Sequence, residues 1–188
     1  YVDLSEHIKN DLDIELLKRT PSAYLGSCRF KLPEICEDRE IYDRIFAILD
    51  KLEVEFFFYI GGNDSMDTIK KLSDYSLLNG SRIRFMGVPK TIDNDLAATD
   101  HTPGYGSAAK YIGAITKEVI RDGLVYDQQN VTILEIMGRN AGWLTGAAAL
   151  AKCEDCEGPD MIFLPEVTFD VDSFMKKVEE LHRHKKSV

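Results

Sequence analysis

Short apolar runs alternate with longer amphipathic stretches along most of the chain. Residues 54–60 are almost continuously apolar, which is typical of a strand buried on both faces of a sheet. Residues 41–52, just before this run, carry apolar side chains at helical spacing. Because this alternation recurs, the sequence predicts an α/β fold with helices covering a mostly parallel sheet.

The same pattern predicts the remaining elements. The Ala-rich stretch 143–151 is expected to form a helix that packs in the core. Further strands are expected at residues 82–88, 131–137 and 161–164, and further helices at residues 66–78, 108–121 and 171–182.

Polar clusters follow the ends of four predicted strands. They begin at Gly61, Pro89, Gly138 and Pro165. Ligands of open α/β sheets bind outside the carboxyl ends of the strands. We therefore expect the four clusters to converge on one active site.

Composition and charge narrow the class of protein. The 188 residues are 44% hydrophobic and 29% charged, enough to bury a core. A net charge of -9 argues against nucleic acid and anionic membranes as partners, and no apolar run approaches the roughly 20 residues of a membrane span. With no targeting segment visible at its start, we expect a soluble, cytoplasmic protein.

The cysteines and histidines give no metal centre. Four cysteines are too few for a disulfide framework in a chain of this size. Cys153 and Cys156 form a C-x-x-C without a second such pair, so we interpret them as thiols of a polar loop. His182 and His184 lie in a basic stretch that suits the end of a helix.

Gly61 and Gly62 open the first polar cluster. Glycines after a strand let backbone amides approach an anion, but they also serve as a plain turn with Asp64 or Ser65 capping the next helix. The chain has no G-x-x-x-x-G-K-[ST] or G-x-G-x-x-G segment, which argues against a P-loop nucleotidase and a standard dinucleotide site.

The acidic loop at residues 91–95 carries more information. Asp93 and Asp95 lie two positions apart, so one can take a proton while the other orients it or handles a metal. Lys90 adds a point charge suited to phosphate. The alternatives are an Asx-turn loop and a solvated surface lysine.

Arg139 is the candidate cation of the third cluster. Its planar guanidinium suits a phosphate or a sugar oxygen. A loop arginine that pairs with an acid is the alternative.

Four segments together resemble the phosphofructokinase family: residues 61–65 (GGNDS), 89–95 (PKTIDND), 137–139 (MGR) and 165–166 (PE). The resemblance runs from about Gly26 to the end of the chain. It implies a three-layer, doubly wound, mostly parallel sheet with helices on both faces. Residues 1–188 would be the donor-binding and catalytic domain, without the family's N-terminal Gly-rich segment and later substrate-binding half.

The resemblance also implies roles for the polar residues. Asp93 would be the general base on the 1-hydroxyl of fructose 6-phosphate, and Asp95 its catalytic companion. The sugar phosphate would be contacted by Thr91, Ile92, Asp93, Met137, Gly138 and Arg139.

Donor choice follows from two departures from the family pattern. ATP-dependent members typically read G-G-D-G-S and G-T-I-D-N-D, whereas this chain has Asp64 and Lys90, as in the pyrophosphate-dependent branch. Asp64 would repel a nucleotide α-phosphate, and Lys90 would stabilise charge on a smaller donor. The donor pocket would comprise Arg29, Gly62, Asn63, Asp64 and Ser65.

The implied reaction is reversible phosphoryl transfer from pyrophosphate to fructose 6-phosphate, giving fructose 1,6-bisphosphate and phosphate in glycolysis. Mg²⁺ is the implied cofactor and a homodimer or homotetramer the implied assembly. Asn63 stands where many members carry a metal-binding Asp, and Asn130 where bacterial ATP-dependent members carry an arginine that reaches a neighbouring subunit. An ATP-dependent phosphofructokinase and a non-catalytic regulatory paralogue are the alternatives.

Overall fold

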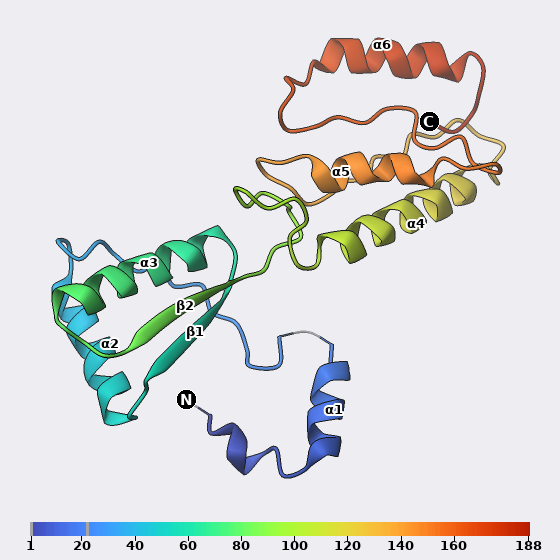
Figure 1. Ribbon diagram of the computed structural model, residues 1–188. Helices are drawn as coiled ribbons and strands as arrows, with labels where there is room; N and C mark the ends of the chain where they lie inside the picture. The colour runs from blue at the N-terminus through green and yellow to red at the C-terminus, as the bar shows by residue number, and fades with distance from the viewer. Residues whose placement is uncertain (1, 22) are drawn as a thin grey trace. The chain divides into compact units, whose positions relative to one another are not determined.

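A computed structural model describes residues 2–21 and 23–188. The chain forms two compact units, Tyr1–Pro33 and Glu34–Val188. The first unit holds the 3-10 helix η1 (Leu4–Glu6) and helix α1 (Asp11–Arg19) (Figure 1). The pattern of apolar residues did not predict α1.

Side-chain caps explain where three helices begin. Asn10 and Asp13 form a reciprocal capping box at the start of α1, a local signal that periodicity does not detect. Asp38 accepts a hydrogen bond from the Ile41 N–H at the start of α2 (Arg39–Lys51). Asp170 caps α6 (Val171–His182), whose bounds match the predicted helix 171–182.

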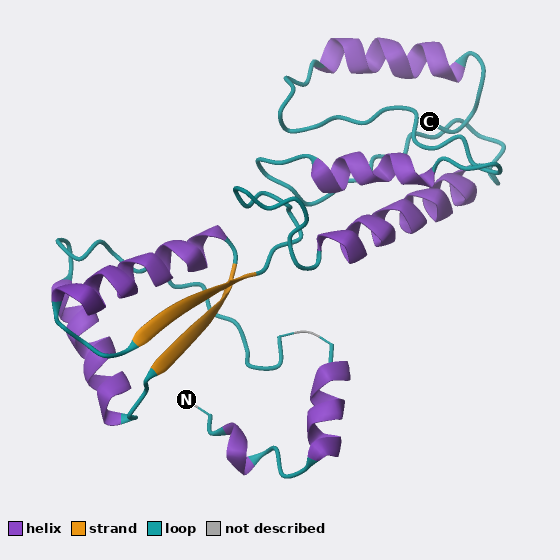
Figure 2. Cartoon of the chain, viewed as in Figure 1, coloured by secondary structure: helices purple, strands orange, loops and turns teal. Residues whose placement is uncertain are grey.

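Two parallel strands form the sheet of the second unit. Strand β1 (Phe56–Gly61) pairs with β2 (Arg84–Pro89) from Phe56 opposite Arg84 to Gly61 opposite Pro89. Helix α3 (Asn63–Leu78) connects them along the chain (Figure 2). The predicted α/β class and the predicted parallel pairing are therefore confirmed.

An aromatic cluster fills the space between this sheet and its helices. Phe46 of α2 contacts Tyr75 of α3 and Phe85 of β2, with ring centroids 5.0 and 5.4 Å apart. Tyr42 lies 5.0 Å from Tyr75, and burial raises the pKa of Tyr42. These contacts hold α2 and α3 against one face of the sheet.

The opposite face of β1 is exposed in the described structure. Phe56, Phe58 and Ile60 are 54%, 60% and 59% exposed. The prediction that residues 54–60 are buried on both faces was therefore wrong. The rings from α2 and α3 lie against the other side of the strand, where Phe57 packs on Phe85.

Helix α4 (Tyr105–Gly123) packs against α5 (Trp143–Ala147) and the 3-10 helix η2 (Ala148–Ala151). Ala147, Ala148 and Ala151 are buried, so the predicted packing of the Ala-rich stretch is confirmed. Leu150 packs so closely on Gly113 that a Cβ at position 113 would lie 3.1 Å from the Leu150 Cβ.

The strands predicted at residues 131–137 and 161–164 are not formed in the part of the chain that the structure describes. Residues 131–137 have one flanking bridge, Asn130 with Ser187, and one bond from the Thr132 N–H to the Val188 carbonyl. A strand needs a ladder of such bonds to a neighbour. The apolar pattern indicates burial but does not supply that neighbour, and Ile133 remains 75% exposed.

None of the helices in the described residues combines the length and apolarity needed to cross a bilayer.

Candidate active site

The carboxyl ends of β1 and β2 bring the first two polar clusters together. The Lys90 N–H donates a hydrogen bond to the Gly61 carbonyl across 2.8 Å, just beyond the last paired residues of the strands. The expected convergence of the clusters at Gly61 and Pro89 is thus confirmed.

Helix α3 presents backbone N–H groups at this edge. Its first turn bonds back to Gly62, through the N–H groups of Ser65 and Met66, both at 3.0 Å. No side chain caps this end, so the alternative in which Asp64 or Ser65 caps the helix was wrong. Asn63 and Asp64 precede these bonds, and their N–H groups are therefore placed to meet an anion.

Gly61 is required by the turn itself. A Cβ at this position would lie 2.0 Å from the Ser65 Oγ, too close for any side chain. Glycine therefore permits α3 to begin immediately after β1.

The acidic loop is held by hydrogen bonds from residues that the sequence did not single out as site residues. Thr102 donates its hydroxyl to the Thr91 carbonyl at 2.6 Å, and its N–H to the Asn94 side chain at 2.9 Å. Asn94 donates to the Asp100 carbonyl at 3.1 Å and has a left-handed backbone with φ of 56°. Asn adopts this left-handed conformation more readily than most residues. The residue type at position 94 therefore indicates a role in shaping the loop.

Asp93 has an unused acceptor inside this loop. Its N–H donates to the Thr91 hydroxyl at 3.1 Å, so a threonine side chain makes this turn and not the Asp or Asn side chain of the Asx-turn alternative. Its Oδ1 is buried and has no hydrogen-bond partner among the described residues. A buried polar atom without a partner costs free energy, so a ligand that donates to this atom would remove the penalty.

Asp95 is linked to the start of α3. The Asn63 Nδ2 donates a hydrogen bond to the Asp95 Oδ2 at 3.0 Å. This contact connects the two clusters through side chains as well as through the backbone. It commits the amide nitrogen of Asn63 to Asp95.

The same residues fit a Mg²⁺ ion that is carried by a phosphate ligand. Mg²⁺ binds oxygen and usually takes one or two protein carboxylates, with phosphates and water completing its shell. Asp95 offers carboxylate oxygens here. Asn63 has its amide oxygen as its remaining ligand atom.

The third and fourth clusters meet each other. The Gly142 N–H donates to the Glu166 Oε1 at 2.7 Å, which joins the turn after residue 138 to the Pro165–Glu166 segment. Gly138 has φ of 139°, and a Cβ there would lie 2.5 Å from the Ala141 carbonyl oxygen. Glu166 therefore links the two clusters structurally. The sequence analysis included Glu166 in a motif but predicted no role for it.

Within residues 23–188, three predicted site residues are not joined to the acidic loop by a hydrogen bond or an ion pair. Met137 and Arg139 are exposed, and within residues 23–188 neither they nor Gly138 form a hydrogen bond or ion pair with residues 90–95. Arg139 also forms no ion pair within residues 23–188, so its alternative role as the partner of an acidic residue is not supported. Arg29 is exposed in the first unit, so its approach to the donor remains a prediction.

The side chain of Asn130 forms hydrogen bonds to other residues of the same chain. Its Nδ2 donates to the Gly123 carbonyl at 3.4 Å, and its Oδ1 accepts from the Ser187 hydroxyl at 2.9 Å. These bonds give Asn130 a local structural role.

A large apolar cavity of about 980 Å³ lies elsewhere in the second unit. It is lined by α4 and by the residues predicted to form strands, Val131 and Ile133 among them. None of residues 61–65, 90–95 or 137–139 lines it. The candidate site at the strand ends is therefore separate from this cavity.

Comparison with known proteins shows the family of the chain. Residues 3–188 match the family described as Phosphofructokinase. The chain belongs to the phosphofructokinase family. It is 44% identical over 170 residues to the pyrophosphate–fructose 6-phosphate 1-phosphotransferase of Xanthomonas campestris pv. campestris (strain B100), covering 89% of this chain and 41% of that one.

Other members of the family differ in their sequence identity to this chain. The protein of the same description from Halomonas elongata is 40% identical over 95% of this chain and 43% of its own. An ATP-dependent 6-phosphofructokinase from Glaesserella parasuis is 36% identical over 84% of this chain and 44% of its own. The chain thus spans less than half the length of these phosphofructokinase-family relatives.

A solved structure of the family has the same fold. The pyrophosphate-dependent phosphofructokinase from Nitrosospira multiformis superposes with a TM-score of 0.86 at 39% identity, covering 100% of this chain and 46% of that one.

Proposed function

We propose that the protein carrying this chain transfers a phosphoryl group from pyrophosphate to the 1-hydroxyl of fructose 6-phosphate, giving fructose 1,6-bisphosphate and phosphate. The observation that carries the proposal is the buried Oδ1 of Asp93, which has no partner in the described residues and lies in a loop fixed at the end of β2. A sugar hydroxyl would donate to this atom.

Asp93 acts as the general base of the proposed reaction. It takes the proton of the 1-hydroxyl while the sugar oxygen attacks the distal phosphorus of pyrophosphate, and phosphate leaves. The bonds from Thr102 and Asn94 hold the loop, so Asp93 is positioned before the substrate arrives.

The donor would lie at the N-terminal end of α3. Backbone N–H groups of Asn63 and Asp64, with Gly62 and Ser65 around them, would face its phosphates, and Lys90 would balance the charge that develops during transfer. Lys90 is exposed and its backbone is anchored to Gly61.

The sugar phosphate would be bound by the remaining site residues. Thr91, Ile92, Met137, Gly138 and Arg139 contact it, and the guanidinium of Arg139 matches a phosphate. The exposure of Arg139 leaves its guanidinium free for such a ligand in the described chain.

Pyrophosphate is favoured over ATP as the donor by two residues and by the relatives. Asp64 places a carboxylate in the first turn of α3, where a nucleotide α-phosphate would be repelled. Four relatives described as pyrophosphate–fructose 6-phosphate 1-phosphotransferases are 40–44% identical over most of the chain, whereas a fifth and an ATP-dependent 6-phosphofructokinase are each 36% identical.

The setting of the proposed enzyme follows from the same chemistry. Mg²⁺ bound to pyrophosphate would use Asp95, and Asn63 through its amide oxygen, and would supply charge neutralisation on the donor. We also propose a homodimer or homotetramer, and a cytoplasmic location that suits four free cysteines and phosphorylated sugars.

The test is a donor assay on the full-length polypeptide, with fructose 6-phosphate and either pyrophosphate or ATP. We expect rapid formation of fructose 1,6-bisphosphate with pyrophosphate and little with ATP. ATP use without pyrophosphate use would make the protein an ATP-dependent enzyme, and sugar-phosphate binding without turnover would make it a regulatory paralogue.

A further inference from the structure

Cys153 and Cys156 face each other across a two-residue hairpin. The Cys153 N–H donates to the Cys156 carbonyl at 2.9 Å, and the Cys156 N–H donates to the Cys153 carbonyl at 3.2 Å. Residues paired in this way have Cα atoms about 5.5 Å apart, within the range of roughly 4.4–6.8 Å found for disulfides. Their side chains also leave the same face of the hairpin.

The two thiols differ in access. Both are free, but Cys153 is exposed whereas Cys156 is buried at 7% exposure. A reagent in solution therefore reaches Cys153 first. Cys156 is shielded from solvent and has Cys153 as its nearest partner in the hairpin.

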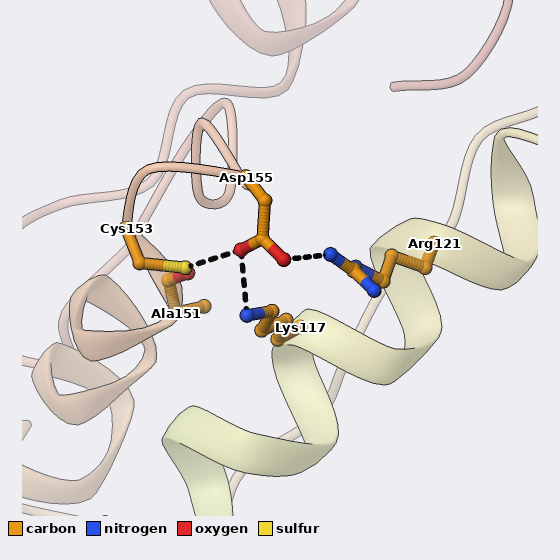
Figure 3. Close-up of polar contacts among 5 residues, drawn as sticks. All are labelled: Lys117, Arg121, Ala151, Cys153 and Asp155. Atoms are coloured by element: carbon orange, nitrogen blue, oxygen red, sulfur yellow. Dashed lines mark hydrogen bonds and ion pairs between the residues drawn. The ribbon is translucent and has the colours of Figure 1, made fainter.

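Lys117 and Arg121 of α4 point toward the carboxylate of Asp155, which also contacts Cys153 (Figure 3). Its Sγ donates to the Asp155 Oδ1 at 3.0 Å, and Lys117 places its Nζ 2.7 Å from the same oxygen. Arg121 pairs with the other carboxylate oxygen. Two cations thus lie at a single carboxylate beside the sulfur, so the charged cluster next to Cys153 is positive overall.

The carboxylate of Asp155 remains charged in this cluster. The hydrogen bond from Cys153, and then that from Lys117, holds the pKa of Asp155 well below its ordinary value. Asp155 is therefore an anion that accepts the hydrogen bond from Cys153.

We propose that Cys153 and Cys156 are a redox modification site that forms a reversible disulfide, with Cys153 as the attacking thiol and Cys156 as the resolving thiol. The Cys153 thiolate attacks one sulfur of a small-molecule disulfide and releases one thiolate. The Cys156 thiolate then attacks the Cys153 Sγ and releases the second. The two cysteines lose two electrons to the small disulfide and two protons to solvent.

The test exposes the full-length protein to glutathione disulfide, blocks remaining thiols by alkylation, and maps the peptides by mass spectrometry. We expect the peptide that holds both cysteines to lose two hydrogen atoms, and to regain them with dithiothreitol. The exposed Cys28 and Cys36 report non-specific oxidation in the same sample. Continued alkylation of Cys153 and Cys156, or a lasting glutathione adduct on Cys153, would overturn the proposal.

Matched variants separate the two roles. Cys156→Ser should stop at a lasting glutathione adduct on Cys153, and Cys153→Ser should leave the buried Cys156 unmodified. Rapid adduct formation on Cys156 in the second variant contradicts the assigned roles.

Lys117→Gln tests the contribution of the cations. It should slow disulfide formation about fivefold, the effect expected from one nearby charge in a water-like medium. Lys110→Gln, an exposed position on the same helix, is the control and should have no effect. Equal rates in the two variants overturn the role of Lys117.

Discussion

The side chain of Asn63 donates a hydrogen bond to Asp95 across 3.0 Å, joining residues that lie 32 positions apart in the sequence. Asn63 belongs to the first turn of α3 and Asp95 to the end of the acidic loop. The bond links the proposed donor side of the site to its proposed catalytic side. The amide at position 63 therefore does what an ionised aspartate cannot, because an ionised carboxylate has no hydrogen to donate to Asp95.

Asn63→Asp tests this link. It would set two carboxylates against each other, and we expect kcat with pyrophosphate to fall about tenfold, equivalent to about 1.4 kcal/mol. Steady-state kinetics of the full-length enzyme measures the change. The reciprocal pair Asn63→Asp with Asp95→Asn restores one donor and one acceptor, and should recover thermal stability without recovering activity.

Full activity in the single variant Asn63→Asp would contradict the role of this bond. Recovery of activity by the reciprocal pair would instead remove the catalytic role from Asp95.

Thr102 is predicted to stabilise the acidic loop. Thr102→Val keeps the shape but removes the hydroxyl, leaving the Thr91 carbonyl without its bond at 2.6 Å. We expect the free energy of unfolding to fall by about 1–3 kcal/mol and turnover to fall with it.

Thermal unfolding and steady-state kinetics of the two Thr102 variants measure these effects. Thr102→Ser keeps the hydroxyl and should behave almost as the parent. A loss in the Ser variant with none in the Val variant would show that the methyl group, and not the hydrogen bond, matters.

Asp64 is predicted to exclude nucleotides. Asp64→Gly removes a carboxylate from the first turn of α3, so kcat/KM with ATP should rise at least about tenfold relative to that with pyrophosphate. Asp64→Asn removes the charge but keeps the size. A rise in both variants assigns the exclusion to charge, a rise in Gly alone assigns it to size, and no rise in either contradicts the role of Asp64.

The stabilising effect of Asp155 should depend on pH. Its pKa lies below the ordinary value of 3.8 in the folded protein, so its contribution is complete above that value and is lost as the pH falls toward the folded value. The difference in thermal midpoint between the parent and Asp155→Asn should therefore shrink below about pH 4.

Asp122→Asn is the control for this titration, since Asp122 is an exposed carboxylate on α4. Its effect on the thermal midpoint should be small and should not vary in the same way. A difference for Asp155→Asn that stays constant from about pH 5 down to about pH 3 contradicts the assignment.

Local and periodic features of the sequence predicted much of this fold. The helices at residues 41–52 and 171–182 carry strong apolar periodicity, and the structure has them as α2 and α6 within two residues at each end. The strands predicted at 54–60 and 82–88 also form and pair in parallel. Residues 131–137 have an equally apolar pattern but lack a ladder partner in the described chain, and partners are not encoded in periodicity.

The sequence predicted which residues form the candidate site, but it predicted few of the contacts between them. The strand-end rule placed Gly61 and Lys90 together, and their backbones are hydrogen-bonded. The same rule did not reveal the bond from Asn63 to Asp95 or the bonds from Thr102. Those contacts depend on loop conformations, such as the left-handed backbone of Asn94, that only the folded chain defines.

The most direct test of the proposed function is the turnover of Asp93→Asn in the full-length enzyme with pyrophosphate and fructose 6-phosphate. Asn keeps the shape of the side chain but cannot take the proton, so kcat should fall by roughly 10²–10⁴-fold with the fold unchanged by circular dichroism. Asp100→Asn, an exposed carboxylate near the same loop, is the control and should stay near the parent rate. An Asp93→Asn enzyme that turns over at the rate of that control would contradict the assignment of Asp93 as the base.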